Sequence, residues 1–164
     1  MGADVKLRQS DIDLLVFDFD GVLTDNRVIV FQDGTEAVVC NRSDGLAFDA
    51  FRRHGLKTMI MSTEKNSVVS QRARKLQVPV IQSLSNKGQA IITFCAENAI
   101  DMCRVAFVGN DLNDLQAMEK VGFAIAPGDA HPSVKAVAHI TLFAKGGYGV
   151  AREIAEDILH LDIA

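Results

Sequence analysis

The sequence has few cysteines and no apolar run of the roughly 20 residues that a membrane helix needs. Its cysteines, Cys40, Cys95 and Cys103, are odd in number and form no CxxC or Cys/His spacing, so neither a disulfide framework nor a zinc site is indicated. Each is expected to be a small buried apolar residue. Residues 1–10 carry charge and no apolar core of signal-peptide length. We therefore expect a cytoplasmic protein without membrane contact.

An excess of basic residues is also missing. The 164 residues include 21 acidic and 17 basic side chains, for a net charge of −4, and contain no Lys/Arg run. This balance argues against a nucleic-acid partner and against an anionic membrane surface. Repeats, low-complexity segments and linkers are absent as well. At 48% hydrophobic residues, the chain can bury a core of its own, and we expect a single domain over residues 1–164.

One stretch contains an apolar run that ends abruptly in carboxylates. Residues 14–17 are all apolar and predict a strand that is buried on both faces. Asp18 and Asp20 follow and share a face of the extended chain. Because sites form beyond the carboxyl ends of parallel strands, and because two close carboxylates repel, the pair predicts a compensating cation such as Mg²⁺. Gly21 gives the backbone room to turn, and Thr24 supplies a hydroxyl one turn later.

Two β-rich runs come next. Residues 27–31 and 35–40 flank Asp33-Gly34 and predict a hairpin directly after the first strand. A hairpin at this place is unusual in an open parallel sheet. Its apolar side chains on both runs indicate that something covers it, such as another subunit.

Strands and helices alternate over the rest of the chain. Expected strands cover residues 58–61, 79–81, 104–108, 122–125 and 139–142. Expected helices run from an Asp44 N-cap to Gly55, from 66 or 67 to 76, from 85 to 98, up to 120, from 133 to 138 and from 150 to 161. The alternation predicts an α/β fold, a Rossmann-like parallel sheet with helices on both faces. No connection is long enough to be an inserted second domain.

Polar side chains follow several of these strands or open the next helix. In a parallel sheet such positions meet at one edge. They are Asp18, Asp20, Ser62, Lys87, Asn110 and Asp111.

Residues 18–25, Asp-Phe-Asp-Gly-Val-Leu-Thr-Asp, resemble the first motif of the haloacid dehalogenase superfamily of phosphohydrolases. The extended tail of the motif is similar to that of small sugar-acid phosphatases without a cap domain, which act on 3-deoxy-octulosonate 8-phosphate or on nine-carbon sialic-acid-type 9-phosphates. Residues 146–153 resemble the closing GGxGxxRE segment of that group, so the likeness covers nearly the whole chain. The resemblance implies a Mg²⁺-dependent phosphatase of a 2-keto-3-deoxy sugar-acid phosphate.

The resemblance also implies roles. Asp18 would be the nucleophile that forms an aspartyl-phosphate, and Asp20 would protonate the leaving oxygen and then activate water. Ser62 would hydrogen-bond the phosphate, and Lys87 would neutralise charge on the nucleophile and the phosphoryl group.

The metal ligands implied by the resemblance are Asp18, Asp20 and the motif around Asn110 and Asp111. Most members of the superfamily carry Gly-Asp-Asp where this chain has Gly-Asn-Asp. Either Asn110 ligates as a neutral oxygen with Asp111 supplying charge nearby, or Asp111 takes over. We favour the first, with weakened metal affinity.

Expected substrate contacts are Thr24, Glu64, Arg72 and Lys75. Octulosonate phosphatases commonly carry an arginine where this chain has Glu64, so Glu64 favours the nine-carbon type. Arg72 and Lys75 match positions that reach a neighbour's site in tetrameric members, where a guanidinium suits a substrate carboxylate. The resemblance therefore implies a homotetramer whose active sites lie at subunit interfaces.

Two other interpretations stay open. Similar domains occur as non-catalytic oligomerisation modules beside enzymes that activate sialic acids with CMP; Asn110 favours this, whereas the intact Asp18 and Asp20 oppose it. A phospho-signalling receiver also uses aspartates, Ser/Thr and Lys on an open sheet. In receivers, however, the phosphorylated aspartate ends a later strand, and no hairpin follows the first.

Overall fold

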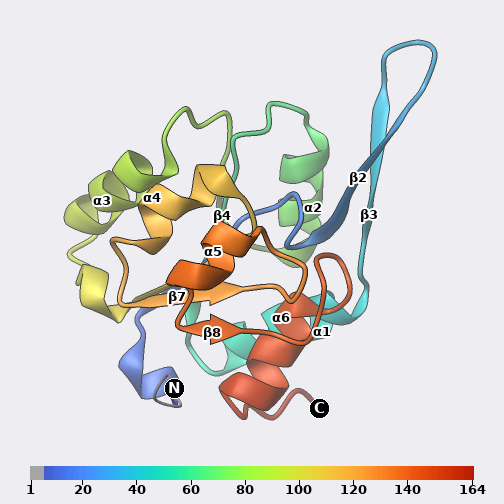
Figure 1. Cartoon of the computed structure of the whole chain (residues 1–164). Helices are drawn as coiled ribbons and strands as arrows, with labels where there is room; N and C mark the ends of the chain where they lie inside the picture. Colours follow the sequence, from blue (N-terminus) through green and yellow to red (C-terminus); the bar gives the residue numbers. More distant parts are fainter. Residues whose placement is uncertain (1–5) are drawn as a thin grey trace.

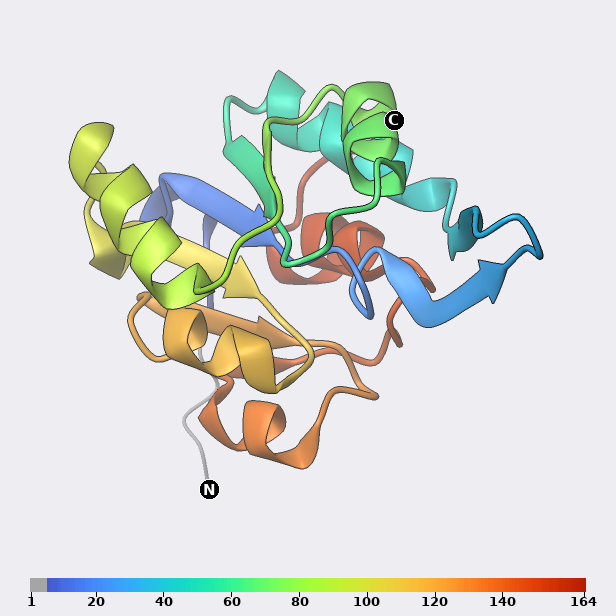
Figure 2. The same cartoon turned by 90° about the horizontal axis from the view of Figure 1, so that it is seen from above.

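The computed structural model describes residues 6–164 and contains a six-stranded parallel sheet with helices on both faces (Figures 1 and 2). The strand order is β5-β4-β1-β6-β7-β8. The strands are β1 (Leu14–Phe17), β4 (Lys57–Met61), β5 (Val80–Ile81), β6 (Val105–Val108), β7 (Phe123–Ala126) and β8 (Ile140–Thr141). The helices are α1 (Ser43–Arg53), α2 (Val68–Leu76), α3 (Lys87–Glu97), α4 (Leu115–Met118), α5 (Pro132–Val137) and α6 (Val150–Glu153), with short helical turns η1 (Gln9–Asp11), η2 (Met102–Arg104), η3 (Leu112–Asp114) and η4 (Ile154–Ile158).

The first strand lies at the centre of the sheet. In β1, Phe17 is in register with Ile60 of β4 on one side and with Val108 of β6 on the other. All four residues of β1 and of β6 are buried, as continuous apolar runs in a parallel sheet require. The carboxyl ends of these three strands therefore lie side by side, and the residues that follow them share one edge of the sheet.

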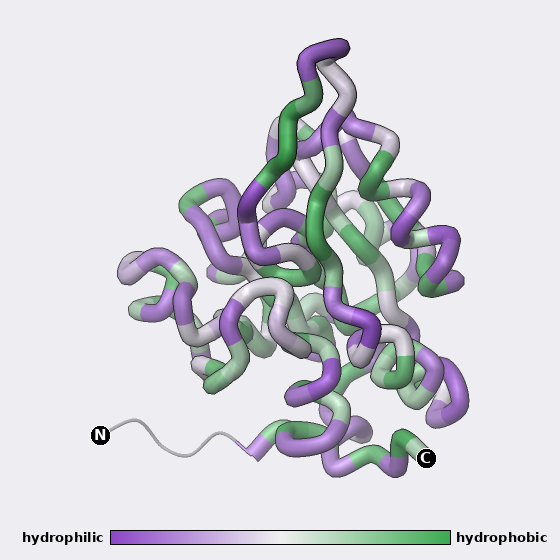
Figure 3. The backbone as a smooth tube through the Cα atoms, turned by 90° about the vertical axis from the view of Figure 1, so that its right-hand side faces the viewer, coloured by the Kyte–Doolittle hydropathy of each residue, from purple (hydrophilic) through white to green (hydrophobic). Residues whose placement is uncertain are grey.

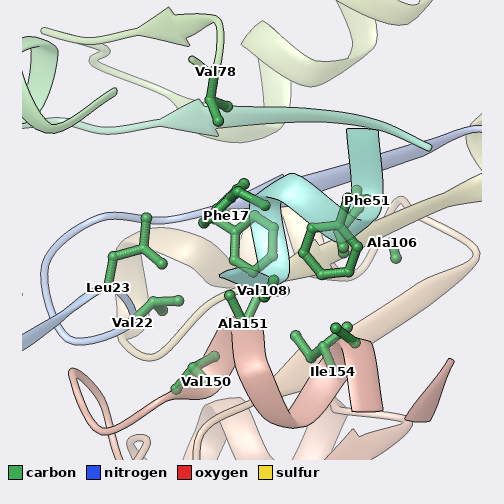
Figure 4. Close-up of a cluster of buried hydrophobic side chains, with 14 of the residues drawn as sticks. Phe17, Val22, Leu23, Phe51, Val78, Ala106, Val108, Val150, Ala151 and Ile154 are labelled. Carbon is green, nitrogen blue, oxygen red and sulfur yellow. The ribbon is translucent and has the colours of Figure 1, made fainter. Parts of the chain in front are cut away.

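Two helical layers cover the sheet and enclose separate apolar cores. One core packs α1, α2 and α6 against the face that includes Phe17 and Val108, with Ala151 and Ile154 of the C-terminal helix beneath them (Figure 4). The other packs α3, α4 and α5 against the face that includes Val16. Successive side chains of β1 thus serve opposite cores, as alternation along a strand requires.

The predicted hairpin forms a separate two-stranded sheet, β2 (Thr24–Val30) and β3 (Glu36–Cys40), that projects away from the body of the molecule (Figure 1). Both strands carry apolar residues while the turn is polar (Figure 3). Every side chain from Val28 to Phe31 is at least half exposed, between 51% and 63%. Val38 and Cys40 of β3 pack partly against the core, whereas no described residue covers the outer part of β2 from Val28 onward.

Three local predictions were wrong. Asp44 is not the N-cap of α1: the helix begins at Ser43, whose N–H donates to Oδ1 of Asn41, and Asp44 is buried inside its first turn. The closing helix keeps α-geometry only over α6 and continues as a π-helical turn, η4. Cys103 is exposed, because it lies in η2 at the surface.

Cys40, Cys95 and Cys103 are free thiols in residues 6–164. No helix among these residues is both long and apolar enough to span a bilayer. We expected residues 1–10 to carry no signal peptide and one domain to span residues 1–164. Both predictions include residues 1–5, which lie outside the described residues.

Candidate active site

The edge of the sheet beyond β1 holds a buried carboxylate. Asp18 follows β1 directly, its main-chain N–H donates to the carbonyl of Val108, and its side chain is 4% exposed. Its Oδ1 accepts a hydrogen bond of 2.6 Å from the N–H of Phe19. The end of the strand therefore fixes Asp18 between the ends of β4 and β6, as the sequence predicted.

Lys87, the first residue of α3, reaches this carboxylate. Its Nζ lies 2.6 Å from Oδ1 of Asp18 and 2.6 Å from Oδ1 of Asp114, and all three side chains are at least 95% buried. The other oxygen of Asp114 accepts from the main-chain N–H groups of Asn110 and Asp111 at 2.9 and 3.2 Å. Asp114 thus connects the lysine to the loop that carries Asn110. Removing one partner of such a buried ion pair typically costs about 3–5 kcal/mol.

The charges in this cluster act on one another. Burial, and next the carboxylate of Asp114, raises the pKa of Asp18 to about 7, against the opposing effect of Lys87. Burial alone would lower the pKa of Lys87, but Asp18 and Asp114 outweigh it and the pKa of the ammonium is raised. Lys87 therefore stays charged. A further cation beside Asp18 would favour the ionised form of the Asp18 carboxyl group.

The loop after Asp18 turns tightly through Gly21, whose φ is +83°. A side chain at Gly21 would also collide with the Asn110 amide, since a Cβ would lie 2.0 Å from Nδ2. Thr24 is completely buried; its hydroxyl accepts from the N–H groups of Gly21 and Asn26 at 3.2 Å and donates to Oδ1 of Asp20 at 3.5 Å. The expected substrate contact of Thr24 is therefore replaced by a contact that orients Asp20 inside the loop.

Asp20 is half-buried and borders a cavity of about 280 Å³ at the base of the hairpin. Glu36, Glu64 and Asn66 line the same cavity. Burial, and next the negative charge of Glu64, raises the pKa of Asp20. A carboxyl group with a raised pKa can hold a proton to donate.

The predicted Glu64 does face this cavity. Its Oε1 accepts from the N–H groups of Lys65 and Asn66 at 2.6 and 2.8 Å, so the carboxylate is held by its own loop. Glu36, from the start of β3, was missed by sequence reasoning. It accepts a 3.0 Å hydrogen bond from Asn66, and no local pattern reveals which hairpin residue meets this loop.

Ser62 follows β4 and is 1% exposed. Its N–H donates to the carbonyl of Ile81, and its hydroxyl accepts from the N–H of Glu64. Ser62 therefore stands one strand away from Asp18 at the edge of the sheet, and no acceptor among residues 6–164 takes its hydroxyl hydrogen.

Asn110, after β6, lies against both aspartates. One end of its amide is 3.1 Å from Oδ2 of Asp18 and 2.9 Å from the main-chain oxygen of Asp20. With its NH₂ group at that end, Asn110 donates to both oxygens. With its oxygen there, three oxygens face one another, which is the kind of donor set that Mg²⁺ prefers. No three His, Cys, Asp or Glu side chains of residues 6–164 gather into a metal site, so a cation here would depend on amide and main-chain oxygens.

Asp111 points elsewhere. Its carboxylate accepts from the N–H of Leu112 at 2.7 Å and caps the short helix η3 at the surface. The structure thus brings Asn110, and not Asp111, against Asp18, and which of the two binds a metal stays a prediction.

Arg72 and Lys75 of α2 are not among the residues that line the Asp20 cavity. Arg72 donates from Nη2 to the carbonyl of Asn41 at 2.7 Å, where β3 leads into α1, and Lys75 is exposed. Within one chain, neither side chain joins the site. A contact with a neighbour's substrate stays a prediction.

Comparisons with known proteins agree with this site. Residues 54–154 match the family model of haloacid dehalogenase-like hydrolases. The 3-deoxy-D-manno-octulosonate 8-phosphate phosphatase of Escherichia coli K12 is 33% identical over 97% of this chain and 85% of its own length. This chain therefore belongs to the haloacid dehalogenase-like hydrolases, among their phosphatases.

Solved structures show the same fold without a cap domain. A protein described as a HAD family hydrolase from Streptomyces avermitilis superposes with a TM-score of 0.93 at 43% identity, covering 97% of this chain and 91% of that one. The 3-deoxy-D-manno-octulosonate 8-phosphate phosphatase of Moraxella catarrhalis, determined with magnesium, phosphate and KDO, superposes with a TM-score of 0.87 at 30% identity, covering 92% and 87%. The parallel sheet and the class of enzyme predicted from the sequence are thus confirmed.

Proposed function

We propose that this protein is a Mg²⁺-dependent phosphomonoesterase that hydrolyses a phosphorylated 2-keto-3-deoxy sugar acid through an aspartyl-phosphate on Asp18. One observation carries the proposal: a buried lysine lies 2.6 Å from a strand-end aspartate, and one end of the Asn110 amide lies 3.1 Å from that aspartate's other oxygen and 2.9 Å from the main-chain oxygen of Asp20. Hydrolysis of a phosphate monoester needs a barrier reduction of about 20 kcal/mol or more, which requires a positioned nucleophile, a proton donor and concentrated positive charge.

The proposed reaction has two steps. A carboxylate oxygen of Asp18 attacks phosphorus, the P–O bond to the sugar breaks, and Asp20 gives its proton to the departing sugar oxygen. Asp20, now ionised, takes a proton from water, whose oxygen attacks phosphorus; the acyl-phosphate bond breaks and releases inorganic phosphate with Asp18 restored. The raised pKa of Asp20 fits the first role, because the group must be protonated when substrate arrives.

Positive charge around the phosphoryl group would come from Lys87 and from Mg²⁺ held by Asp18, the main-chain oxygen of Asp20 and Asn110. Bound there, Mg²⁺ would neutralise the growing charge on the phosphoryl oxygens. The Moraxella relative, whose structure contains magnesium, supports this choice of cation. Ser62 would donate its free hydroxyl hydrogen to a phosphoryl oxygen.

The substrate is proposed as octulosonate 8-phosphate or a nonulosonate 9-phosphate. The relatives named octulosonate 8-phosphate phosphatases, at 31–33% identity, support the first. Glu64 lines the cavity that Asp20 borders, at a position where those enzymes commonly carry arginine, and this difference favours the second substrate. Both sugars are acids, so a cation near the substrate carboxylate is required, and Arg72 or Lys75 of a neighbouring subunit would supply it.

We further propose a homotetramer in which a neighbour's hairpin covers each site. The half-exposed apolar residues of the hairpin, from Val28 to Phe31, support this arrangement because an uncovered apolar surface of this kind marks an interaction site. A cover would also keep bulk water away from the aspartyl-phosphate.

The test is Mg²⁺-dependent phosphate release from a panel of eight- and nine-carbon keto-sugar-acid phosphates and simple hexose phosphates. Asp18→Asn is the inactive reference, and Asp49→Asn, the same change at an exposed position of α1, is the matched control. Selective release from one acid sugar, lost by at least about 10⁴-fold in Asp18→Asn only, is expected. Release equal to that of Asp18→Asn from every substrate would contradict the proposal and favour a non-catalytic oligomerisation module, which Asn110 would suit.

A further inference from the structure

The glycine segment, residues 146–149, lies directly against the loop that carries Asp20. The N–H of Gly147 donates to the carbonyl of Val22 at 2.9 Å. Figure 4 shows Val22 and Leu23 beside Val150, the first residue of the helix that follows this segment. A part of the chain more than 120 positions away thus supports the catalytic loop.

The contact is too close for any side chain. A Cβ at Gly146 would lie 2.2 Å from the carbonyl oxygen of Gly21 and 3.0 Å from that of Thr24. A Cβ at Gly147 would lie 2.4 Å from the main-chain nitrogen of Asp25, and this glycine also has a φ of +74°. These neighbours are main-chain atoms, which cannot rotate aside, so a larger residue must displace the catalytic loop or the segment itself.

The glycine segment is tied in turn to the loop after β7. Oδ1 of Asp129 accepts from the N–H of Gly146 at 2.9 Å. In the same loop, the N–H of His131 donates to the carbonyl of Asn110 at 2.8 Å. The loop of residues 127–131 therefore holds the glycine segment on one side and the Asn110 loop on the other.

We infer that Gly146, Gly147 and Asp129 are positioning residues that set where Asp20 stands relative to Asp18 and Asn110. The inference rests on the proposed function in so far as it gives Asp20 a proton to donate and its main-chain oxygen a metal to face. Internal hydrogen bonds already close the loop: the carbonyl of Phe19 accepts from the N–H groups of Leu23 and Thr24. These hydrogen bonds fix the shape of the loop but not its position relative to the sheet, and the contact with the glycine segment sets that position. A displacement of about 1 Å at a reacting group costs on the order of 100-fold in rate.

The first test compares Gly146→Ala with Gly45→Ala, a control inside α1 where a Cβ would meet nothing within 4 Å. Gly146 has no positive φ, so steric contact alone decides the effect. The substrates are phenyl phosphate and p-nitrophenyl phosphate, because the phenoxide leaving group needs a proton and p-nitrophenoxide hardly does. We expect kcat/KM of Gly146→Ala to fall about 10- to 100-fold for phenyl phosphate and less than about 5-fold for p-nitrophenyl phosphate. Equal losses on both esters, or no loss, would overturn the inference.

The second test needs no turnover. Isothermal titration with Mg²⁺ alone should show about 10-fold weaker binding to Gly146→Ala than to Gly45→Ala, since the oxygen of Asp20 moves away from Asn110 and Asp18. Unchanged Mg²⁺ affinity would overturn the inference even if activity fell. A wild-type protein that binds Mg²⁺ but cleaves no ester would refute the proposed function and still leave this test decisive.

Asp129 provides the rescue control. Asp129→Ala removes the acceptor for the N–H of Gly146, whereas Asp129→Asn keeps an oxygen at the same place. The inference requires Asp129→Ala to shift the ratio of the two esters in the direction of Gly146→Ala and Asp129→Asn to restore it. Loss of stability in Asp129→Ala with an unchanged ratio would mean that the residue is merely structural.

Discussion

At the scale of single residues, Asn110 distinguishes this chain from the usual motif of its superfamily. Its amide can face Asp18 and Asp20 with either end, so it can donate to them without a metal and accept a metal when one binds. An ionised aspartate at the same place could only accept hydrogen bonds, and it would add a negative charge beside the carboxyl groups of Asp18 and Asp20.

Asn110→Asp is therefore expected to bind Mg²⁺ about 10-fold more tightly, and to unfold more easily by about 1–2 kcal/mol when metal-free, because two buried acceptors lose their donor. Calorimetric titration with Mg²⁺ and urea unfolding in the presence of EDTA measure the two effects. Asn113→Asp, the same change at an exposed position in η3, is the control and should leave both unchanged. An unaltered Mg²⁺ affinity in Asn110→Asp would show that the amide does not face the metal.

The roles of single residues divide into those that a motif predicts and those that it does not. Asp18, Lys87 and Asn110 lie together as predicted because each follows or opens an element at the same edge of the sheet. Thr24 and Arg72 were expected at the substrate but bond to their own chain, at Asp20 and Asn41. A motif records which residue types are present, whereas burial and hydrogen bonding decide which atoms remain free for a ligand.

At the scale of elements, Asp44 holds two helices together. It lies in α1, is 1% exposed, and its Oδ1 accepts from the main-chain N–H of Arg152 at the start of α6. Burial raises the pKa of this carboxyl to about 6, against the opposing hydrogen bond from Arg152 and the charge of Arg72. The helix dipole and the hydrogen bond favour a carboxylate here, but burial outweighs them.

The raised pKa has a consequence for stability. An unfolded aspartate has a pKa near ~3.9, so between about pH 4 and pH 6 the folded state binds more protons than the unfolded state, and the free energy of unfolding falls as the pH rises. Asp44→Asn removes this contribution and keeps the acceptor for Arg152. It should be more stable than the wild type by about 1–2 kcal/mol at pH 7.5 and by less at pH 4.5.

Urea unfolding at the two pH values measures the difference, with Asp49→Asn, on the exposed side of α1, as the control that should show no such dependence. A constant difference between Asp44→Asn and the wild type across this range would show that the carboxyl does not titrate there.

At the scale of the whole molecule, the hairpin carries the longest run of exposed large apolar residues among residues 6–164. Val28, Ile29 and Val30 expose both faces of the outer part of β2, and Phe31 follows them, which a stable monomer rarely does over a contiguous surface. Because the valines are already about half buried, covering the rest of each against a neighbour would contribute about 1 kcal/mol, so several such contacts can hold subunits together.

Replacing Val28 and Val30 by lysine should therefore convert the proposed tetramer into smaller species, because two charges would have to be buried in the interface. Light scattering and sedimentation velocity measure the mass, and Gln32→Lys at the exposed turn is the control that should keep it. A monomeric wild type would refute the shared site.

The sequence by itself determined the order of strands and helices along the chain and the edge of the sheet at which the polar residues gather. These follow from local causes: apolar runs of strand length, helical periodicity, and residues placed directly after a strand. The superfamily followed separately, from the resemblance of residues 18–25 and 146–153 to known motifs. The tertiary structure alone decided that Asp114 holds Lys87, that Thr24 turns to Asp20, and that the glycines at 146 and 147 press on the catalytic loop. Those contacts join positions up to 125 residues apart, and they depend on close packing that no periodicity along the chain encodes.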